Sequence, residues 1–415
     1  MHVKSILRTI VHYKGFVIKE VTWDLHKSAL LVDIQPRRGS LPCCSVCGKK
    51  CSAYDRLKPR RFQFVPLWGY AVFLVYALRR VNCPTCKVKV EKIPWSDGKQ
   101  QTTYTFRIFL ATWAKRLSWK ETASIFDTSW DTVFRAIQWV VYWGIAHREI
   151  SQVNAIGIDE IQYRKGHNYL TMVYQIDKDC RRLLYVARER TEGSLRGFFS
   201  VISDETLQSL KYICSDMWPA YLNVIKESVP NAAHVLDRFH VMRKISEKID
   251  RVRAQEVRQL KQDGYEPVLT HSRWCLLKRP ENLTESQSLK MQELLKYNLK
   301  SVKAYLMRED FQRFWTYCGK AWAAKFLEQW CQRAKQSRIG PMQEAARTLL
   351  KHKDLILSWF SADGAISNGI VEGFNNKAKL AMRKAYGFKS YEKIEIALYH
   401  QLGSLPEPES THRFC

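Results

Sequence analysis

The sequence predicts a multidomain α/β protein, and three observations lead to this prediction. The first 98 residues have the pattern of short strands, interrupted by two Cys-x-x-Cys pairs. A stretch rich in Trp, Phe and Ala follows with helical spacing, and strands then alternate with helices from Gln152 to His240. At 415 residues, with 46% hydrophobic content, the chain has room for roughly two to four folded domains.

The charge balance favours a polyanionic partner. The chain carries 67 Lys and Arg against 40 Asp and Glu, a net charge of +27, and nucleic acid is the commonest polyanion that such a surplus attracts. Charge alone leaves a ribosome-associated or membrane-surface protein open. No apolar run is long enough to span a membrane, and Arg8, His12 and Lys14 interrupt the N-terminal apolar residues. We therefore expect a bacterial protein of the cytoplasm, associated with the nucleoid.

The N-terminal segment contains two cysteine knuckles, Cys44-x-x-Cys47 and Cys83-x-x-Cys86. A two-residue gap lets both thiolates of a knuckle reach one metal ion, and two knuckles complete a tetrahedral four-sulfur zinc site, which is structural. The strand pattern between the knuckles is typical of a zinc ribbon. Cys43 and Cys51 lie close in the sequence and leave the choice of Cys44 as a ligand open. Chance Cys-x-x-Cys pairs without metal are the simpler alternative.

The segment after the knuckles predicts a helix-turn-helix. Ser118 can cap a first helix, Glu121 completes its capping box, and Thr128 or Ser129 can cap a second helix. The small Ala123 suits a close helix crossing, and the second helix would enter a DNA major groove. A plain helical hairpin is the alternative interpretation. The candidate DNA contacts on the two helices are Lys120, Thr132 and Arg135.

Two apolar strands of the α/β segment are expected to end in an acidic residue. The first strand ends in Asp159 and the fourth ends in Asp216. The five expected strands span residues 155–159, 168–177, 182–187, 210–216 and 232–237. Three antiparallel strands followed by helix, strand, helix and strand are the ribonuclease-H-like order, in which the first and fourth strands are neighbours. We therefore expect Asp159 and Asp216 side by side at one edge of the sheet.

A third carboxylate, Glu372, comes from a later helix. It shares one polar face with four further residues, whereas the opposite face is apolar. The polar face holds Glu372, Asn375, Asn376, Lys379 and Arg383, and the apolar face holds Val371, Phe374, Ala378 and Ala381. A solvated amphipathic helix is the simpler alternative if this helix is taken alone. Together with Asp159 and Asp216, Glu372 predicts a site for two Mg or Mn ions, because hard divalent cations prefer oxygen ligands.

Asn375 on the later helix and two residues near the fifth strand are candidates for an auxiliary role near the site. Asp237 ends that strand and His240 begins a basic helix, so both can approach the metal site. A packing role is the alternative for Asp237. The basic helix alternates cations with apolar residues, and its cationic face suits a DNA backbone, with a merely solvated face as the alternative. The candidate DNA contacts are Arg243 and Lys244 on this helix, and Lys379 and Arg383 on the later one.

Five motifs give the chain a resemblance to a known family. They are Gly157-Ile-Asp-Glu160, Ser215-Asp-Met-Trp-Pro-Ala-Tyr221, Asp237-Arg-Phe-His-Val241, Asn368-Gly-Ile-Val-Glu-Gly-Phe-Asn375 and Arg383-Lys-Ala-Tyr-Gly-Phe388. On these motifs the chain resembles the DDE transposases of the ISL3 family of bacterial insertion sequences. The Cys43-Cys44 doublet departs from the family, whose members more often have Cys-Pro there. The resemblance implies a zinc-binding N-terminal domain, a helix-turn-helix, and a ribonuclease-H-like core with a helical insertion before the glutamate.

The expected function is that of a DDE transposase. Such an enzyme binds the terminal inverted repeats of an insertion sequence and catalyses two-metal-ion cleavage and strand transfer into target DNA. We expect double-stranded DNA as the partner, and at least a homodimer in the DNA complex. A DNA-binding regulator with an inactive core, and a ribonuclease-H-like nuclease without joining activity, are the alternatives.

The predicted domain boundaries follow from these motifs. They give a zinc-ribbon-like domain at 1–98, a helix-turn-helix region at 99–152, the first part of the core at 153–245, a helical insertion at 246–361, a core helix carrying the catalytic Glu at 362–402, and a tail at 403–415.

Overall fold

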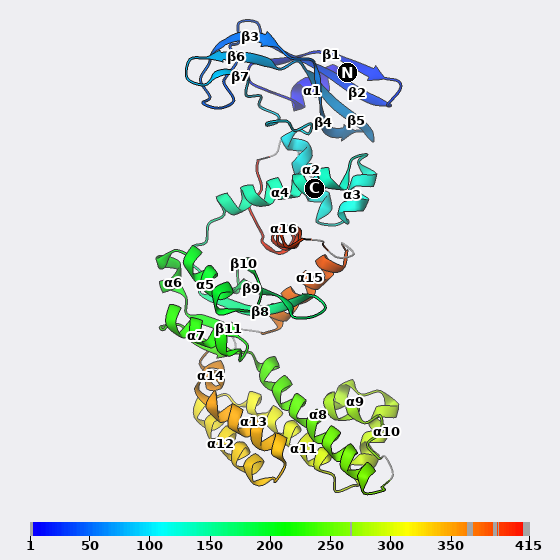
Figure 1. Cartoon of the computed structure of the whole chain (residues 1–415), viewed down its shortest axis with the longest axis vertical. Helices are drawn as coiled ribbons and strands as arrows, with labels where there is room; N and C mark the ends of the chain where they lie inside the picture. The colour runs from blue at the N-terminus through cyan, green and yellow to red at the C-terminus, as the bar shows by residue number, and fades with distance from the viewer. Residues whose placement is uncertain (1–2, 266–267, 363–367, 385–387, 389, 410–415) are drawn as a thin grey trace. The chain divides into compact units, whose positions relative to one another are not determined.

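The chain divides into two compact units (Figure 1). The computed structural model describes residues 3–265, 268–362, 368–384, 388 and 390–409. Unit 1 comprises Met1–Glu149 with Leu380–Cys415, and unit 2 comprises Ile150–Lys379. Residues 385–387, which belong to the last family motif, lie outside the described part of the chain.

Unit 1 contains two small sheets, and buried side chains alternate with more exposed ones along β5. One sheet has the strand order β1-β2-β5-β4, and the other has the order β3-β6-β7. The strands are β1 (Phe16–Asp24), β2 (Ala29–Pro36), β3 (Ser52–Arg56), β4 (Arg60–Leu67), β5 (Tyr70–Tyr76), β6 (Arg79–Cys83) and β7 (Lys87–Val90). A short helix, α1 (Val3–Ile10), precedes them and was not predicted from the sequence.

Helices complete unit 1, and the predicted caps of two of them are confirmed. The Ser118 hydroxyl accepts the Glu121 N–H and the Glu121 carboxylate accepts the Ser118 N–H, which forms the capping box of α3. Ser129 rather than Thr128 caps α4, by accepting the Thr132 N–H. The helices are α2 (Tyr104–Ala114), α3 (Trp119–Ile125), α4 (Trp130–His147) and α16 (Tyr391–Leu402), and α16 packs against α4.

Unit 2 is built on a five-stranded sheet with the order β10-β9-β8-β11-β12. The strands are β8 (Ala155–Arg164), β9 (Asn168–Ile176), β10 (Arg181–Arg188), β11 (Tyr212–Ser215) and β12 (Ala233–Leu236). The first and fourth strands, β8 and β11, pair in parallel, as predicted. The connecting helices are α5 (Glu192–Val201), α6 (Asp204–Ser209) and α7 (Pro219–Ser228), and α5 and α7 pack on one face of the sheet. Helix α6 was not predicted.

The prediction that the first strand ends at Asp159 is wrong. Strand β8 continues to Arg164 and pairs with β9 over that whole length, with Asp159 opposite Met172. Only the parallel pairing with β11 stops early, after Gly157. The apolar run marks the part of β8 that is enclosed by neighbours on both edges, whereas the polar remainder extends along β9 alone.

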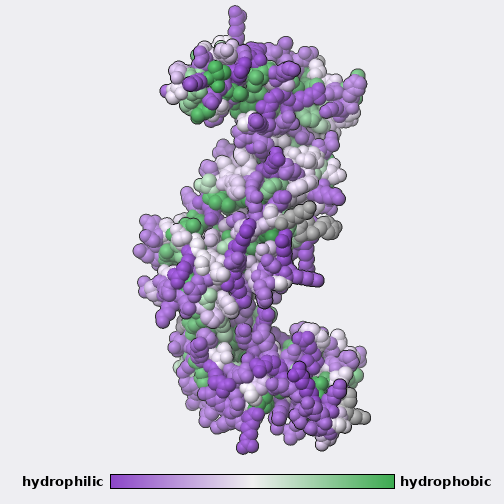
Figure 2. Space-filling view, viewed as in Figure 1, coloured by the Kyte–Doolittle hydropathy of each residue, from purple (hydrophilic) through white to green (hydrophobic). Residues whose placement is uncertain are grey.

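Helices form the segment between the sheet and Glu372, as predicted. They are α8 (Arg238–Gln262), α9 (Arg273–Leu277), α10 (Glu285–Leu294), α11 (Lys300–Gln312), α12 (Lys320–Gln336), α13 (Gly340–Lys351) and α14 (Lys353–Leu357), with short 3-10 turns at Pro280–Asn282, Arg313–Thr316 and Ser358–Ala362. Their core is aromatic, and the predicted apolar stripe of α8, which includes Val241, Ile245 and Ile249, is buried in it. On the face shown in Figure 2, hydrophilic side chains cover most of these helices.

Helix α15 (Asn368–Lys384) returns to the sheet of unit 2 and lies beside β8 and β9 (Figure 1). Its apolar residues Val371, Phe374 and Ala378 are buried, as the helical pattern predicts. Among the described helices, none combines the length and the apolar character that a membrane span requires.

Candidate active site and metal centres

Three aspartates lie at the same level of three adjacent parallel strands. The pairs Cys214↔Gly157 and Ser215↔Leu236 fix the register of β11 against β8 and β12. When this register is continued past the end of β11, Asp216 is level with Asp159 on one side and with Asp237 on the other. Since parallel strands present their carboxyl ends at one edge, the three carboxylates gather there. The neighbouring Glu160 joins them, and we call Asp159, Glu160, Asp216 and Asp237 the carboxylate cluster.

Asp159 is held by hydrogen bonds to both of its carboxylate oxygens. Oδ1 accepts the Glu160 N–H at 2.8 Å, and Oδ2 accepts the Asn375 side-chain amide at 2.6 Å. Burial raises the pKa of Asp159, and the charges of His240 and these hydrogen bonds act in the opposite direction. The carboxylate is therefore desolvated and oriented, which is the condition in which it gains most from a bound cation.

Helix α15 supplies Asn375 to this site because it packs closely on the sheet. A Cβ at Gly157 would lie 2.5 Å from Val371 Cγ2, so glycine permits the approach. The rings of Tyr174 and Phe374 stack at 4.7 Å, and the Tyr174 hydroxyl donates to Asn375 Oδ1 at 3.0 Å. Asn375, one of the expected auxiliary residues, is buried and lies between Tyr174 and Asp159.

Arg190 links two further carboxylates of the cluster, Asp216 and Glu160. Its Nη2 donates to Asp216 Oδ2 at 2.7 Å and pairs with Glu160 Oε1 at 2.8 Å. The second oxygen of Asp216, Oδ1, accepts the Trp218 N–H at 2.9 Å. Burial and the charge of Asp216 raise the pKa of Glu160 to about 8. The cluster thus holds more negative charge than one arginine neutralises.

Asp237 and His240, two of the expected auxiliary residues, also lie close to Asp159 or to each other. Asp237 caps α8 by accepting the Phe239 N–H at 2.7 Å, and burial raises its pKa to about 6. His240 Nε2 lies 3.8 Å from Asp159 Oδ1 and 3.6 Å from Asp237 Oδ2. The imidazole therefore stands between two carboxylates that both carry a raised pKa.

Glu372 is not gathered into the cluster in this structure. Its side chain is exposed on α15, one helical turn before the buried Asn375. Within the described residues, the only group of three or more ligand atoms that all lie within 4.8 Å of one another consists of four thiols. Asp159, Asp216 and Glu372 therefore do not all have an oxygen within that distance of one another, and Glu372 would have to approach for all three to share a metal.

The four thiols are those of Cys44, Cys47, Cys83 and Cys86, as predicted. The sulfurs of Cys47 and Cys83 lie 3.5 Å apart, close to the ~3.8 Å expected between ligands of a tetrahedral zinc–sulfur site. The N–H groups of Cys86 and Thr85 lower the pKa of the Cys83 thiol to about 6, which favours the thiolate. Cys43 lies outside this group, so the structure favours Cys44 as the ligand. The arrangement fits a structural zinc ion.

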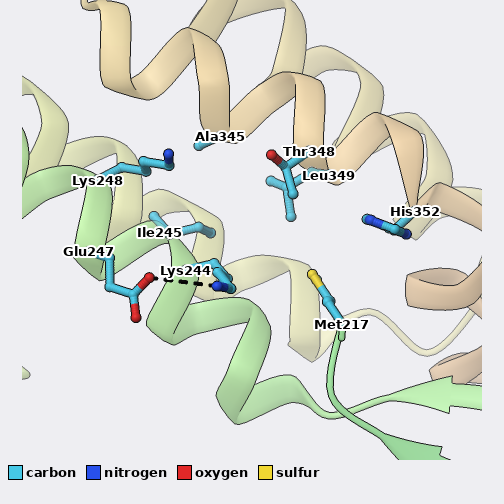
Figure 3. Close-up of a pocket in the computed structure, with 9 residues that line it drawn as sticks. All are labelled: Met217, Lys244, Ile245, Glu247, Lys248, Ala345, Thr348, Leu349 and His352. Carbon is cyan, nitrogen blue, oxygen red and sulfur yellow. Dashed lines mark ion pairs between the residues drawn. The ribbon is translucent and has the colours of Figure 1, made fainter. Parts of the chain in front are cut away.

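Cations line α8 beyond the carboxylate cluster. The helix carries eight Lys and Arg against three Asp and Glu. Arg243 and Lys244 are exposed and pair with Glu247 at 3.2 and 3.8 Å, so part of their charge is neutralised. A cavity of about 260 Å³ lies between α8 and α13 (Figure 3). It is lined by Met217, Lys244, Ile245, Glu247, Lys248, Ala345, Thr348, Leu349 and His352. Met217 directly follows Asp216, so this cationic hollow adjoins the cluster.

The remaining predicted DNA contacts lie on helix surfaces. Lys120, Arg135, Lys379 and Arg383 are exposed, whereas Thr132 is half-buried and forms part of the α4 cap. Arg135 pairs with Asp131 at 2.8 Å.

The sequence prediction missed three members of the site: Glu160, Tyr174 and Arg190. Glu160 follows Asp159 directly, so its place in the motif was a usable signal. Tyr174 and Arg190 lie in segments without a distinctive pattern, and only the pairing of the strands brings them to the edge.

A sheet edge that gathers carboxylates beside a helix, in a strongly cationic chain, is typical of metal-dependent enzymes that act on nucleic acid. A family model described as a transposase, of the DDE type and ISL3 group, matches residues 156–398. The chain belongs to this family of DDE transposases and is a DNA transposase. Membership implies a ribonuclease-H-like core, divalent metal ions and action on DNA. The oxygen-only donors of the carboxylate cluster fit such ions.

Relatives of known name cover nearly the whole chain. The transposase for insertion sequence element IS1001 of Bordetella parapertussis is 28% identical over 392 residues, which are 94% of this chain and 96% of the relative. The transposase for insertion sequence element IS1557 of Mycobacterium tuberculosis is also 28% identical, over 410 residues that cover 92% of this chain and 91% of the relative.

Proposed function

We propose that this transposase cleaves DNA at the ends of an insertion sequence and joins those ends to target DNA, with Asp159, Asp216 and Glu372 as its catalytic carboxylates. The common register of Asp159 and Asp216 on adjacent strands is the observation that carries the proposal. We include Glu372 because α15 already places Asn375 beside Asp159. Glu372 lies one helical turn earlier, so a movement of its side chain can bring it to the same edge of the sheet.

Each residue of the site has a distinct part in this proposal. Asp159, Asp216 and Glu372 would hold two Mg or Mn ions, which when bound stabilise the attacking and leaving oxygens of a phosphodiester. Asn375 and the Glu160 N–H fix the direction of the Asp159 oxygens before DNA arrives. His240 Nε2 lies near Asp159 Oδ1 and near Asp237 Oδ2, so His240 and Asp237 can orient Asp159 or receive a proton.

We infer that DNA is held by surfaces outside the carboxylate cluster. The α3–α4 pair would serve as a helix-turn-helix, because its capped helices expose Lys120 and Arg135, and the zinc-bound sheet of β3, β6 and β7 would stabilise the N-terminal part. Arg243 and Lys244 beside the cationic hollow, with Lys379 and Arg383 on α15, would contact the phosphate backbone. Binding of two terminal inverted repeats at once would need at least a homodimer. A nucleoid location remains a prediction.

The test compares carboxamide variants in a reconstituted reaction. Asp159→Asn, Asp216→Asn and Glu372→Gln should each abolish Mg-dependent cleavage and strand transfer of a duplex that carries the element's inverted repeat, by at least ~10³-fold, while binding of that duplex persists. Glu205→Gln, an exposed acid on α6, is the matched control and should keep both steps. Cleavage that survives in Asp159→Asn, or cleavage without any joining by the unmodified enzyme, would contradict the proposal.

A further inference from the structure

Arg190 is more deeply engaged with the carboxylate cluster than any other cation in the described part of the chain. It follows β10, and its Nη2 is shared between Asp216 Oδ2 at 2.7 Å and Glu160 Oε1 at 2.8 Å. Its guanidinium also lies over the indole of Trp218, 4.1 Å from the ring centroid. Two segments therefore meet at one planar cation: β8 through the Glu160 carboxylate, and the turn after β11 through the Asp216 carboxylate and the Trp218 ring.

Some buried polar atoms at Arg190 and Glu160 form no hydrogen bond within the described residues. The Arg190 Nε and the Glu160 Oε2 are both buried, and neither has a hydrogen-bond partner among the residues that the structure describes. Two carboxylates share a single nitrogen, although a guanidinium offers five N–H groups. A cation that served only to lock the fold would be expected to satisfy more of these atoms.

The place that Arg190 occupies is the side of Asp216 that a metal ion would need. Asp216 Oδ1 already accepts the Trp218 N–H, and its other oxygen, Oδ2, accepts a hydrogen bond from Arg190. An arginine charge close to a carboxylate neutralises it much as a divalent ion does, but with one positive charge instead of two. Glu160 and Trp218 would still hold the guanidinium if Asp216 released it.

We propose that Arg190 is a positioning residue that occupies the metal-binding oxygen of Asp216 in the metal-free enzyme and yields it to the incoming divalent ion. This inference rests on the proposed role of Asp216 as a metal ligand. Arg190 keeps the Asp216 carboxylate aimed into the site and limits repulsion within the cluster. When a metal ion is bound, Arg190 would keep its contacts with Glu160 and Trp218, so its guanidinium would remain beside the site. The metal must compete with it, so Arg190 lowers the affinity for divalent ions.

Metal affinity, measured with Mn²⁺ alone on the zinc-loaded full-length protein, tests this directly. By titration calorimetry at pH 8, Arg190→Gln should bind Mn²⁺ tighter by on the order of tenfold, because a charge-assisted competitor has been removed. Its unfolding temperature without Mn²⁺ should fall, and the rise on adding Mn²⁺ should exceed that of the unmodified protein. Arg190→Lys keeps a cation without the planar fork and should give a smaller gain in affinity.

Matched variants separate the possible outcomes. Arg196→Gln removes an arginine that pairs with Glu192 and Glu227, which are not members of the carboxylate cluster. This variant should leave Mn²⁺ affinity unchanged. If Arg190→Gln binds Mn²⁺ equally well or more weakly, the inference is overturned. If Arg190→Gln fails to fold, the same comparison is decided with Arg190→Lys. Asp216→Asn should abolish the binding, and undiminished binding there would overturn the proposed role of Asp216 itself.

Discussion

Asn375 provides a polar link between the helix and the sheet of the site. Its amide donates to Asp159, and its carbonyl oxygen accepts the hydroxyl of Tyr174. Tyr174 is buried and Asp159 is mostly buried, so loss of the amide leaves the Tyr174 hydroxyl and the Oδ2 of Asp159 without this partner. A buried donor or acceptor left in this way costs about 1–3 kcal/mol.

Asn375→Ala should therefore lower the free energy of unfolding by about 1–3 kcal/mol and also reduce cleavage, because Asp159 loses its orientation. Urea unfolding and the cleavage assay measure the two effects. Asn376→Ala, at the adjacent exposed position, should change stability by no more than about 0.5 kcal/mol. Equal behaviour of the two variants would contradict the role of Asn375.

His400 on α16 predicts a pH dependence of the stability of unit 1. Burial is the main cause that lowers its pKa from 6.5 to about 3. Between these values the unfolded chain holds a proton that the folded chain lacks, so stability falls as the pH is lowered through this window. His400→Leu should flatten the pH dependence by up to about 1.4 kcal/mol per pH unit. Urea unfolding between pH 4 and 6.5 checks this, and identical slopes would rule it out.

At the scale of elements, the chain's own patterns predicted most of the sheet and its helices. Apolar runs located β8, β9, β10, β11 and β12, and the cap residues located the first residues of α3 and α4 within one or two positions. The end of β8 was missed because a strand with one partner can be polar, and α1 and α6 were missed because short helices carry little periodicity. The contacts of Arg190 depend on strand pairing far along the chain, which no local pattern encodes.

The two knuckles form an element whose stability should depend on zinc. Cys86→Ser removes one of four ligands, so the purified protein should contain far less than one zinc per chain. The β3-β6-β7 sheet should also unfold at a lower temperature than in the unmodified protein. Metal analysis and circular dichroism are the measurements. Cys318→Ser, at an exposed cysteine outside the group, should retain its zinc. Equal zinc content in both variants would refute a four-thiol site.

On the scale of the whole molecule, the net charge of +27 means that the chain has too few acidic residues to pair with every Lys and Arg. Many cations pair with acids, as Arg135 does with Asp131, but the surplus remains available for a polyanion. The sequence therefore predicted the class of partner from composition alone. It could not predict which cations are already paired, since those pairs form only in the folded chain.

DNA affinity should fall steeply with salt. If Arg135 contacts a phosphate, Arg135→Ala should weaken binding similarly for all sequences and lower the slope of log K against log[salt] by about 1. Fluorescence anisotropy with the inverted-repeat duplex between 50 and 300 mM NaCl measures the slope. An unchanged slope would remove Arg135 from the DNA interface.

The most direct measurement is anomalous diffraction from crystals of the enzyme bound to its inverted-repeat DNA and Mn²⁺. We expect manganese peaks at the edge formed by β8 and β11, within about 2.0–2.3 Å of oxygens from Asp159 and Asp216, with Glu372 moved in to complete the set. Manganese bound elsewhere, or bound at that edge while the Glu372 carboxylate stays in solvent, would contradict the three-carboxylate site.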